Sequence, residues 1–278
     1  DIPGEALPEA QKYGTLELAK FVNMRSQALQ LAAGGAAQST DDLEAVEREL
    51  ESAEAGEEAA PEKEFGFLAV CAGSGLAEVF TDLGVDGIIS GGQTMNPSTE
   101  SILKEIKKVH ARTVFVLPNN KNIVMAAQQC VGLTEKNVIV IPTASIPQGI
   151  SALMAVDPDA QEIEQAMNEA AKLVSTAQIT YAARNSDFDG FDIHEGDYLA
   201  LLDGKLLGTD RDVACLLEDL SDEAASRGAE FITLFYGEDV NEEDAQKARE
   251  VFSLKCPDAE ISLIRGGQPV YYYIISIE

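Results

Sequence analysis

The sequence is short of positive charge, histidine and tryptophan. Its 278 residues include 48 Asp and Glu against 20 Lys and Arg, which gives a formal net charge of -28, and they include two His and no Trp. A surface this acidic repels phosphate backbones and anionic lipid headgroups, so the composition argues against a nucleic-acid-binding protein and a polybasic membrane protein. Two histidines also leave little material for a Ser-His-Asp triad or a multi-histidine metal site.

Long apolar runs, clustered cysteines and nucleotide motifs are missing as well. No stretch reaches the roughly 18 apolar residues of a transmembrane helix, so we expect no integral membrane segment. The four cysteines are scattered without CxxC spacing, which favours reduced thiols in a cytoplasmic protein. Neither a Walker A pattern nor GxGxxG occurs, so no nucleotide site is predicted here. Hydrophobic residues still make up 45% of the chain, enough for a largely aliphatic core.

The first quarter of the chain divides into a helical pattern and an acidic linker. Residues 1–37 show an apolar stripe at helical spacing, and residues 38–64 form a polar segment in which positions 41–64 carry eleven acidic and two basic side chains. Such a stretch buries too little apolar surface to fold, so we expect a solvated linker. The chain begins at Asp1 without a signal-peptide pattern, and we expect it to be the tail of a longer protein.

Residues 65–185 alternate between short apolar runs and helical patterns. Strands are predicted at 66–71, 87–90, 113–117, 137–141 and 179–183, and helices at 76–83, 98–109, 123–132 and from 159 to about 175. This rhythm predicts an α/β lobe around a mostly parallel sheet. The continuous apolar run at 138–141 indicates a strand that is buried on both faces.

Residues 186–278 predict a second, smaller α/β lobe. Asp203-Gly204 separates strands at 198–202 and 206–208 and predicts a hairpin with a type I′ turn. Helices at 212–225 and 242–252 and strands at 231–236 and 260–264 follow, with a β-prone run at 269–277. We therefore expect two α/β lobes in one chain.

Small and polar side chains follow each of the first four predicted strands. Ligands of open parallel sheets bind at the carboxyl ends of the strands, so these loops predict one shared polar cleft that suits a phosphate or carboxylate group. Lys121 is the cation in these loops. No catalytic or metal-binding residue is predicted; the candidate ligand-binding residues are Ser74, Gly91, Gly92, Gln93, Thr94, Asn96, Ser98, Asn119, Asn120, Lys121, Asn122, Thr143 and Ser145. The alternative is that Ser98 or Asn96 caps a helix, Gly91-Gly92 permits a turn and Lys121 is a surface residue.

Three runs of residues carry a family resemblance. They are SGGQTMNPSTE at 90–100, LPNNKNI at 117–123 and GGQPVYYYIISIE at 266–278. These runs resemble the C-terminal domain of the bacterial fatty acid kinase catalytic subunit, of the dihydroxyacetone-kinase-like family. PGEAL at 3–7, YGTL at 13–16 and NMR at 23–25 resemble the close of that family's middle domain.

The resemblance implies a three-part protein. In it, an N-terminal DhaL-like domain binds ATP and magnesium, a middle domain dimerises and can carry metal, and the C-terminal part has a two-lobed DegV-like (EDD) fold. The implied partner is a separate acyl-binding DegV-like protein that presents the fatty acid whose carboxylate is phosphorylated. This chain lacks the ATP domain and the middle domain's metal-binding histidines, so we expect no cofactor and no activity in the fragment alone.

The sequence is also compatible with two other functions. The chain could be a lipid-binding carrier that holds a fatty acid in the cleft with its carboxylate on Thr94 or Ser98, which requires an apolar tunnel behind the loops. It could also be a freestanding small-molecule kinase, which the missing ATP motif disfavours. Docking of the acyl-binding partner is the leading hypothesis.

Overall fold

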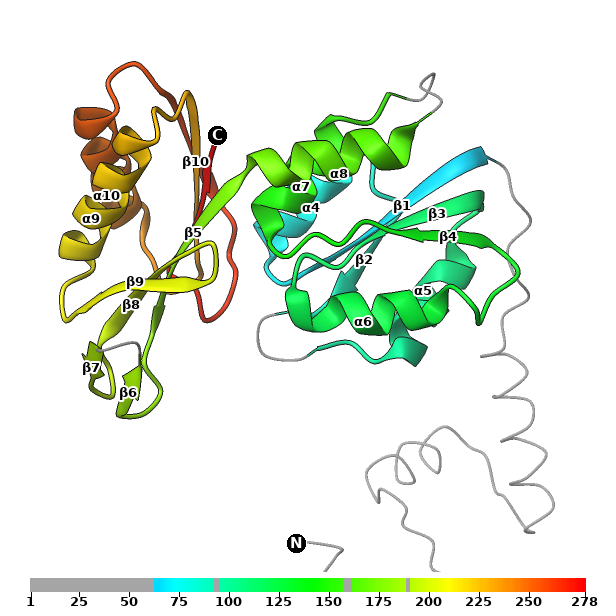
Figure 1. Ribbon diagram of the computed structural model, residues 1–278, viewed down its shortest axis with the longest axis horizontal. Helices are drawn as coiled ribbons and strands as arrows, with labels where there is room; N and C mark the ends of the chain where they lie inside the picture. The colour runs from blue at the N-terminus through cyan, green and yellow to red at the C-terminus, as the bar shows by residue number, and fades with distance from the viewer. Residues whose placement is uncertain (1–62, 93–95, 158–161, 189–190) are drawn as a thin grey trace, which may run out of the picture. The chain divides into compact units, whose positions relative to one another are not determined.

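Four parallel strands form the first sheet. The computed structural model describes residues 63–92, 96–157, 162–188 and 191–278, so the predicted middle-domain segment and most of the predicted linker lie outside the described residues. The strands are β1 (Lys63–Cys71), β2 (Gly87–Ser90), β3 (Ala111–Leu117) and β4 (Asn137–Val140), in the order β2-β1-β3-β4 (Figure 1). All their pairings are parallel, as predicted. The strand order reverses between β1 and β3, where open α/β sheets bind ligands.

Five helices connect or follow these strands. They are α4 (Ser74–Asp82), α5 (Thr99–Lys108), α6 (Lys121–Cys130), α7 (Ile146–Met154) and α8 (Ile163–Leu173). Helix α7 was missed, because Pro147 and Gly149 gave its sequence the composition of a loop. Proline is compatible with the first turn of a helix, where its missing N–H costs no hydrogen bond, and Ser145 supplies the N-cap.

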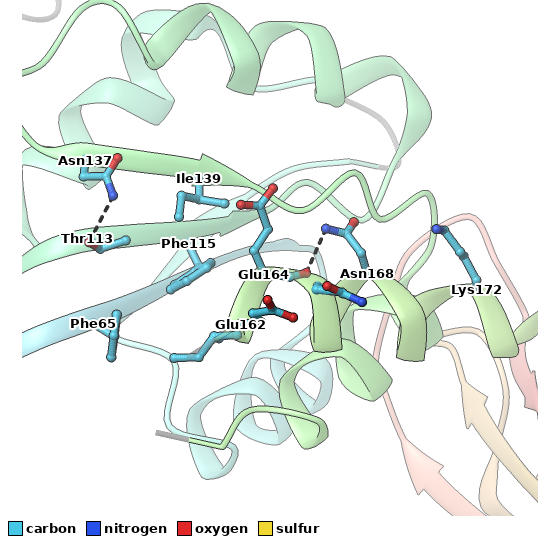
Figure 2. Close-up of a pocket in the computed structure, with 11 residues that line it drawn as sticks. Phe65, Thr113, Phe115, Asn137, Ile139, Glu162, Glu164, Asn168 and Lys172 are labelled. Atoms are coloured by element: carbon cyan, nitrogen blue, oxygen red, sulfur yellow. Dashed lines mark hydrogen bonds between the residues drawn. The ribbon is translucent and has the colours of Figure 1, made fainter. Parts of the chain in front are cut away.

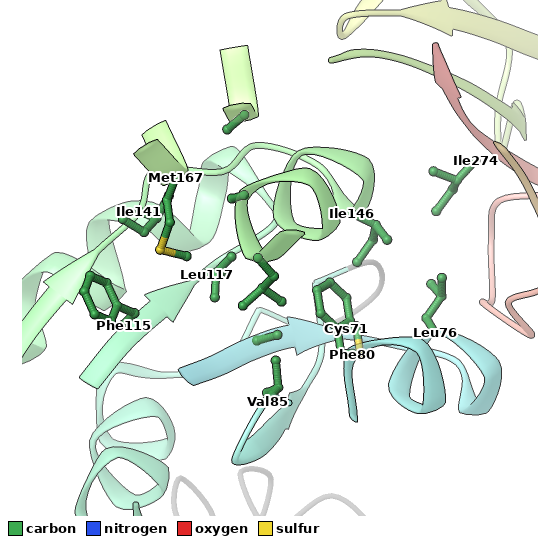
Figure 3. Close-up of a cluster of buried hydrophobic side chains, with 14 of the residues drawn as sticks. Cys71, Leu76, Phe80, Val85, Phe115, Leu117, Ile141, Ile146, Met167 and Ile274 are labelled. Carbon is green, nitrogen blue, oxygen red and sulfur yellow. The ribbon is translucent and has the colours of Figure 1, made fainter. Parts of the chain in front are cut away.

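Each face of the first sheet packs against helices. On one face, Phe115 and Leu117 join Leu76 and Phe80 of α4 and Met167 of α8 in a buried cluster (Figure 3). On the other face, the intervening strand residues pack against α5 and α6 in a separate cluster that includes Val114, Val116, Ile102, Ile106 and Ile123. The strands are buried on both sides, which explains their continuous apolar sequences.

The second sheet has six strands and mixed pairing. The strands are β5 (Ser175–Tyr181), β8 (Tyr198–Leu202), β9 (Lys205–Asp210), β10 (Phe231–Tyr236), β11 (Glu260–Arg265) and β12 (Tyr273–Ile277), in the order β11-β10-β12-β5-β8-β9. Only β10 and β11 run parallel within this sheet. Helices α9 (Val213–Ser226) and α10 (Glu242–Lys255) cover one face. Two α/β lobes are thus confirmed, although β5 begins at Ser175, where the predicted helix was still running.

The described part of the second lobe contains two β-hairpins, one within the sheet and one outside it. At the turn between β8 and β9, Asp203 and Gly204 have φ angles of 52° and 78°, which confirms the predicted type I′ geometry. The short strands β6 (Ser186–Phe188) and β7 (Phe191–Ile193) also pair with each other. This second hairpin was not predicted, because its alternating Asp residues gave the segment the composition of a solvated loop.

The two lobes meet along a seam of backbone against backbone. The Leu76 N–H, in the first turn of α4, donates to the Gly266 carbonyl at 3.1 Å. A Cβ atom added to Gly75 would lie 1.7 Å from the Arg265 carbonyl oxygen, and one added to Gly73 would lie 2.5 Å from the Gly266 oxygen. Apolar side chains continue this contact, since Phe235 and Ile274 of the second sheet belong to the cluster around Leu76. The approach of the second lobe therefore requires glycine both at Gly73, in the loop after β1, and at Gly75, in the first turn of α4.

We expect Gly75→Ala to lower the free energy of unfolding by about 2 kcal/mol or more, because the added methyl group overlaps a carbonyl oxygen that belongs to fixed backbone. Gly132→Ala is the matched control, since nothing lies within 4 Å of a Cβ atom there. Urea denaturation of the two variants measures the difference. Equal stability of the two variants would contradict the role assigned to the seam.

Candidate functional site

A polar cavity of about 310 Å³ lies at the carboxyl ends of β3 and β4. Five of the predicted ligand-binding residues line it: Asn119, Asn120, Lys121, Asn122 and Ser145. The second sheet supplies the facing wall, with side chains of β5 and the turn between β8 and β9. The cavity therefore lies between the lobes, and among the described residues the third and fourth predicted loops contribute to its lining.

Asn119 ties together the ends of three strands. Its backbone N–H donates to the Thr143 hydroxyl oxygen at 3.1 Å, and that hydroxyl donates to the Asn119 Oδ1 atom at 2.9 Å. The Asn119 Nδ2 atom donates to the Val70 carbonyl at 3.0 Å. The residue is 7% exposed and has a φ of 54°, a conformation that Asn tolerates better than most residues. Both ends of its amide are thus engaged by the protein.

Three of the candidate residues cap helices. Ser98 accepts from the Ser101 N–H at 3.1 Å, Asn120 accepts from the Asn122 N–H at 2.9 Å, and Ser145 accepts from the Gln148 N–H at 3.4 Å. For Ser98 this confirms the capping alternative. Two of the caps also hold distant segments.

The Asn120 Nδ2 atom donates to the Gly92 carbonyl, which joins the loop after β2 to the start of α6. The Ser145 hydroxyl bonds to the Thr176 hydroxyl at 2.7 Å, which joins the start of α7 to β5 in the second sheet. These caps therefore fix both the loops and the position of the second lobe.

The first and second predicted loops do not line the cavity with their described residues. Ser74 is exposed at the start of α4, beside the seam, and Asn96 and Ser98 lie exposed before α5. Gly91 and Gly92 have φ angles of 146° and 105°, so they serve the turn that follows β2. Gln93 and Thr94 lie outside the described residues. The loop after β1 packs against residues 265–268, so its described residues lie at the seam and not at the cavity. For the loop after β2, the predicted share in the cleft stays a prediction.

Lys121 is the cation of the cavity. Its Nζ atom lies over the hairpin turn, 3.2 Å from where a Cβ atom on Gly204 would stand. It forms no ion pair with any residue that the structure describes. The neighbouring Asp203 carboxylate already accepts from the Thr176 N–H at 2.9 Å and lies 3.4 Å from an Arg227 nitrogen. The ammonium group is thus left to the solvent of the cavity.

Sequence patterns missed the wall contributed by the second lobe. These residues are Thr176, Gln178, Asp203, Gly204 and Tyr271. The Asp203-Gly204 turn was visible in the sequence, but nothing there placed it opposite Lys121. Burial raises the pKa of Tyr271, so its hydroxyl stays protonated at neutral pH and can donate a hydrogen bond.

A second hollow of about 630 Å³ lies at the opposite edge of the first sheet (Figure 2). Phe65 and Phe115 form part of its floor, with ring centroids 6.1 Å apart, and Glu162, Glu164 and Lys172 of the α8 region lie on its rim. Thr113 and Asn137 mark the amino-terminal halves of β3 and β4. This edge is remote from the strand ends at which ligands of such sheets bind.

The described residues hold no group of three or more His, Cys, Asp or Glu side chains that could bind a metal ion. Within the same ranges, no helix is both long and apolar enough to cross a membrane.

A match to a protein-family model shows to which family the chain belongs. The model for the FakA-like C-terminal domain of fatty acid kinase matches residues 66–278. The chain belongs to this family. The match begins within β1 and includes both lobes, so the resemblance carried by residues 90–100, 117–123 and 266–278 is confirmed at the level of the family.

Relatives by sequence span more than this chain. Protein YloV of Bacillus subtilis is 38% identical over 279 residues, which cover 99% of this chain and 48% of the relative. Uncharacterized proteins of Staphylococcus haemolyticus and Staphylococcus aureus are 34% and 33% identical over 280 residues, again 48% of their length. The chain thus spans about half the length of the curated relatives it matches.

Relatives by structure share the two-lobed fold. The Fatty Acid Kinase (Fak) B3 protein of Streptococcus pneumoniae, solved with linoleic acid, has a TM-score of 0.53 at 12% identity and covers 77% of this chain and 99% of its own. A stearic acid-binding protein of Eubacterium ventriosum has a TM-score of 0.56 at 13% identity and covers 77% and 98%. At these identities the likeness concerns the fold, and the predicted DegV-like fold is confirmed.

We expect Asn119→Ala to lower the free energy of unfolding by about 2 kcal/mol, since it removes the amide donor of the buried Val70 carbonyl and the amide oxygen that accepts from the buried Thr143 hydroxyl. Asn122→Ala is the control, because that side chain is exposed and makes no hydrogen bond within the described residues. Urea denaturation measures the free energy of unfolding of both variants. A variant of Asn119 as stable as the control would show that the network is dispensable.

The four cysteines differ in exposure, so we expect their thiols to differ in reactivity. Burial raises the pKa of Cys71 to about 12, and burial also raises the pKa values of Cys130 and Cys256. Cys215 is exposed, and Asp210 is the main cause of its raised pKa. Because the thiolate is the reactive form, we expect a disulfide reagent to modify Cys215 alone in the folded protein, faster as pH or salt rises.

Cys215→Ser should abolish this reaction in the folded state, and denaturation should expose the other three thiols. The measurement is a thiol titration before and after adding denaturant. A second thiol that reacts at the rate of Cys215 would contradict the burial of the other three.

Proposed function

We propose that this chain is the C-terminal, non-catalytic region of a fatty acid kinase component, and that it docks an acyl-binding DegV-like partner. ATP and magnesium would be bound by another part of the longer protein, which would transfer the γ-phosphoryl group of ATP to the carboxylate of the presented fatty acid. The family assignment supports the first statement. The fatty acids held by two structural neighbours suggest that an acyl-binding protein shares this fold and can serve as the partner.

The internally bonded cleft is the observation that carries the docking role. Hydrogen bonds within the protein already engage the polar side chains of Asn119, Asn120, Thr143 and Ser145. The cavity wall is made mostly of amide, hydroxyl and charged side chains, with Ile146 as its one large aliphatic residue among the described residues. An acyl chain placed there would gain little from burial, since each methylene group is worth about 0.8 kcal/mol only when it enters an apolar environment.

The space behind the loops is filled by side chains. Leu117, Ile123 and Ile141 are fully buried there, and Phe80 and Phe115 complete the packing between sheet and helices. The carrier hypothesis needed an apolar tunnel at this place. The described residues at the cleft favour docking over storage of a fatty acid.

Other features of the longer protein stay predictions. Homodimerisation was assigned to the middle domain, whose residues in this chain lie outside the described ranges. A cytoplasmic location is expected from the scattered cysteines and awaits fractionation of cells that produce the protein.

Calorimetric titration with a purified acyl-binding DegV-like protein tests the docking role. We expect binding with a dissociation constant of about 10 μM or tighter, the range of specific but reversible protein contacts. The partner is used both loaded with fatty acid and stripped of it, because a protein that receives substrate from its partner should bind the loaded form at least as well. Absence of heat with both forms at about ten times that concentration overturns the proposal.

Solvent extraction followed by mass spectrometry tests the carrier alternative on the same preparation. We expect no stoichiometric fatty acid to accompany the purified chain. One acyl chain per protein molecule, retained after washing with lipid-free albumin, would replace docking by storage.

A further inference from the structure

Helices α9 and α10 lie side by side in the second lobe (Figure 1). A groove of about 410 Å³ is lined by residues of both helices. The start of α9 contributes Arg211, Asp212, Val213, Ala214 and Leu217, and the region of α10 contributes Asp239, Val240, Asp244, Lys247, Ala248 and Val251. Three tyrosines complete its lining: Tyr198, Tyr272 and Tyr273. None of the predicted ligand-binding residues that the structure describes lines this groove, so it is separate from the cleft between the lobes.

The tyrosines form one apolar wall. Tyr198 and Tyr272 meet edge to face with ring centroids 5.1 Å apart, and Tyr181 adds a second edge-to-face contact to Tyr272 at 6.4 Å. Tyr273 is 2% exposed and donates its hydroxyl to the Asp244 carbonyl at 3.3 Å. These contacts hold the rings in place, so the wall is formed before anything binds to it.

The charged side chains leave a negative balance. Lys247 is paired with Asp244 at 2.9 Å and with Glu243 at 3.0 Å, and Arg211 lies 3.5 Å from the buried carboxylate of Asp197. Asp239 makes no ion pair or hydrogen bond with any residue the structure describes. Asp212 uses one oxygen to cap α9, at 2.9 Å from the Ala214 nitrogen. Asp239 and the second oxygen of Asp212 are thus uncompensated at the mouth of an aromatic groove.

An arginine side chain matches this chemistry. Its guanidinium group stacks on aromatic rings, donates to carboxylates in a fixed fork, and leaves water more readily than an ammonium group does. Tyrosine and arginine are both enriched among the few residues that carry most of the binding energy in protein interfaces. A metal ion is a poorer match, because the described residues offer no cluster of three ligands.

We propose that this groove between α9 and α10 receives an arginine side chain from the surface of the acyl-binding partner. This inference rests on the proposed docking function and identifies the groove as the surface that contacts the partner. Charge complementarity favours a basic partner surface, since the chain as a whole carries a formal net charge of -28. Glu242, Glu243 and Asp210 are close in sequence to residues that line the groove and add to the negative charge of this part of the second lobe.

Charge reversal at Asp239 tests the proposal with little risk to folding, since that side chain is exposed and makes no bond in the described structure. Asp258→Lys is the matched control, an exposed aspartate beyond the opposite end of α10 with the same change of charge. The partner is titrated into the wild type and into both variants, and thermal melts confirm that all three are folded.

We expect Asp239→Lys to weaken binding by about tenfold or more and Asp258→Lys to change it by less than about twofold. The wild-type affinity should fall with added salt, and the penalty of Asp239→Lys should shrink with it. Equal affinities of the two variants would overturn the groove as the docking site while leaving the docking function intact. No binding to the wild type would overturn the docking function itself, and the groove with it.

Discussion

The contact between the start of α4 and residues 265–268 is the constraint on which the two-lobed structure depends. A backbone N–H of one lobe donates to a backbone carbonyl of the other, and Gly73 and Gly75 let the two main chains approach within van der Waals distance. Side chains at these positions would hold the sheets apart, and the cluster that joins Leu76 to Ile274 would lose its continuity. The cleft between the lobes and its facing wall depend on this backbone contact for their position.

Hydrogen bonds within the protein determine the structure of the cleft. The polar residues at the carboxyl ends of β3 and β4 form hydrogen bonds to one another and to the second sheet, so they attach the second lobe to these loops. Lys121 and the buried hydroxyl of Tyr271 remain as groups that face the cavity. The loop residues from which a ligand site was predicted thus also attach one lobe to the other.

Much of the fold was readable from the sequence because local rules and tertiary structure agree in most segments. Buried strands were visible as runs such as the one at 138–141, and the Asp203-Gly204 turn has the geometry that its residues favour. Helix α7 escaped because Pro147 is a helix breaker in general and harmless in a first turn. The cleft was half predicted, since the order of strands in the second sheet, which places Thr176 and Asp203 opposite α6 and α7, is a property of contacts between residues far apart in the chain.

The central position of β12 sets the order in which the molecule can fold during synthesis. Tyr273–Ile277 pairs with β10 on one side and with β5 on the other, nearly a hundred residues earlier in the chain. As the ribosome releases the chain, every element of the first sheet emerges well before β12 does. Until then, β5 and β10 have an open edge toward each other, and Ile274 is missing from the core beside Leu76. The sheet of the second lobe therefore cannot be completed until Tyr273–Ile277 has been synthesised, because these residues form the strand between β5 and β10.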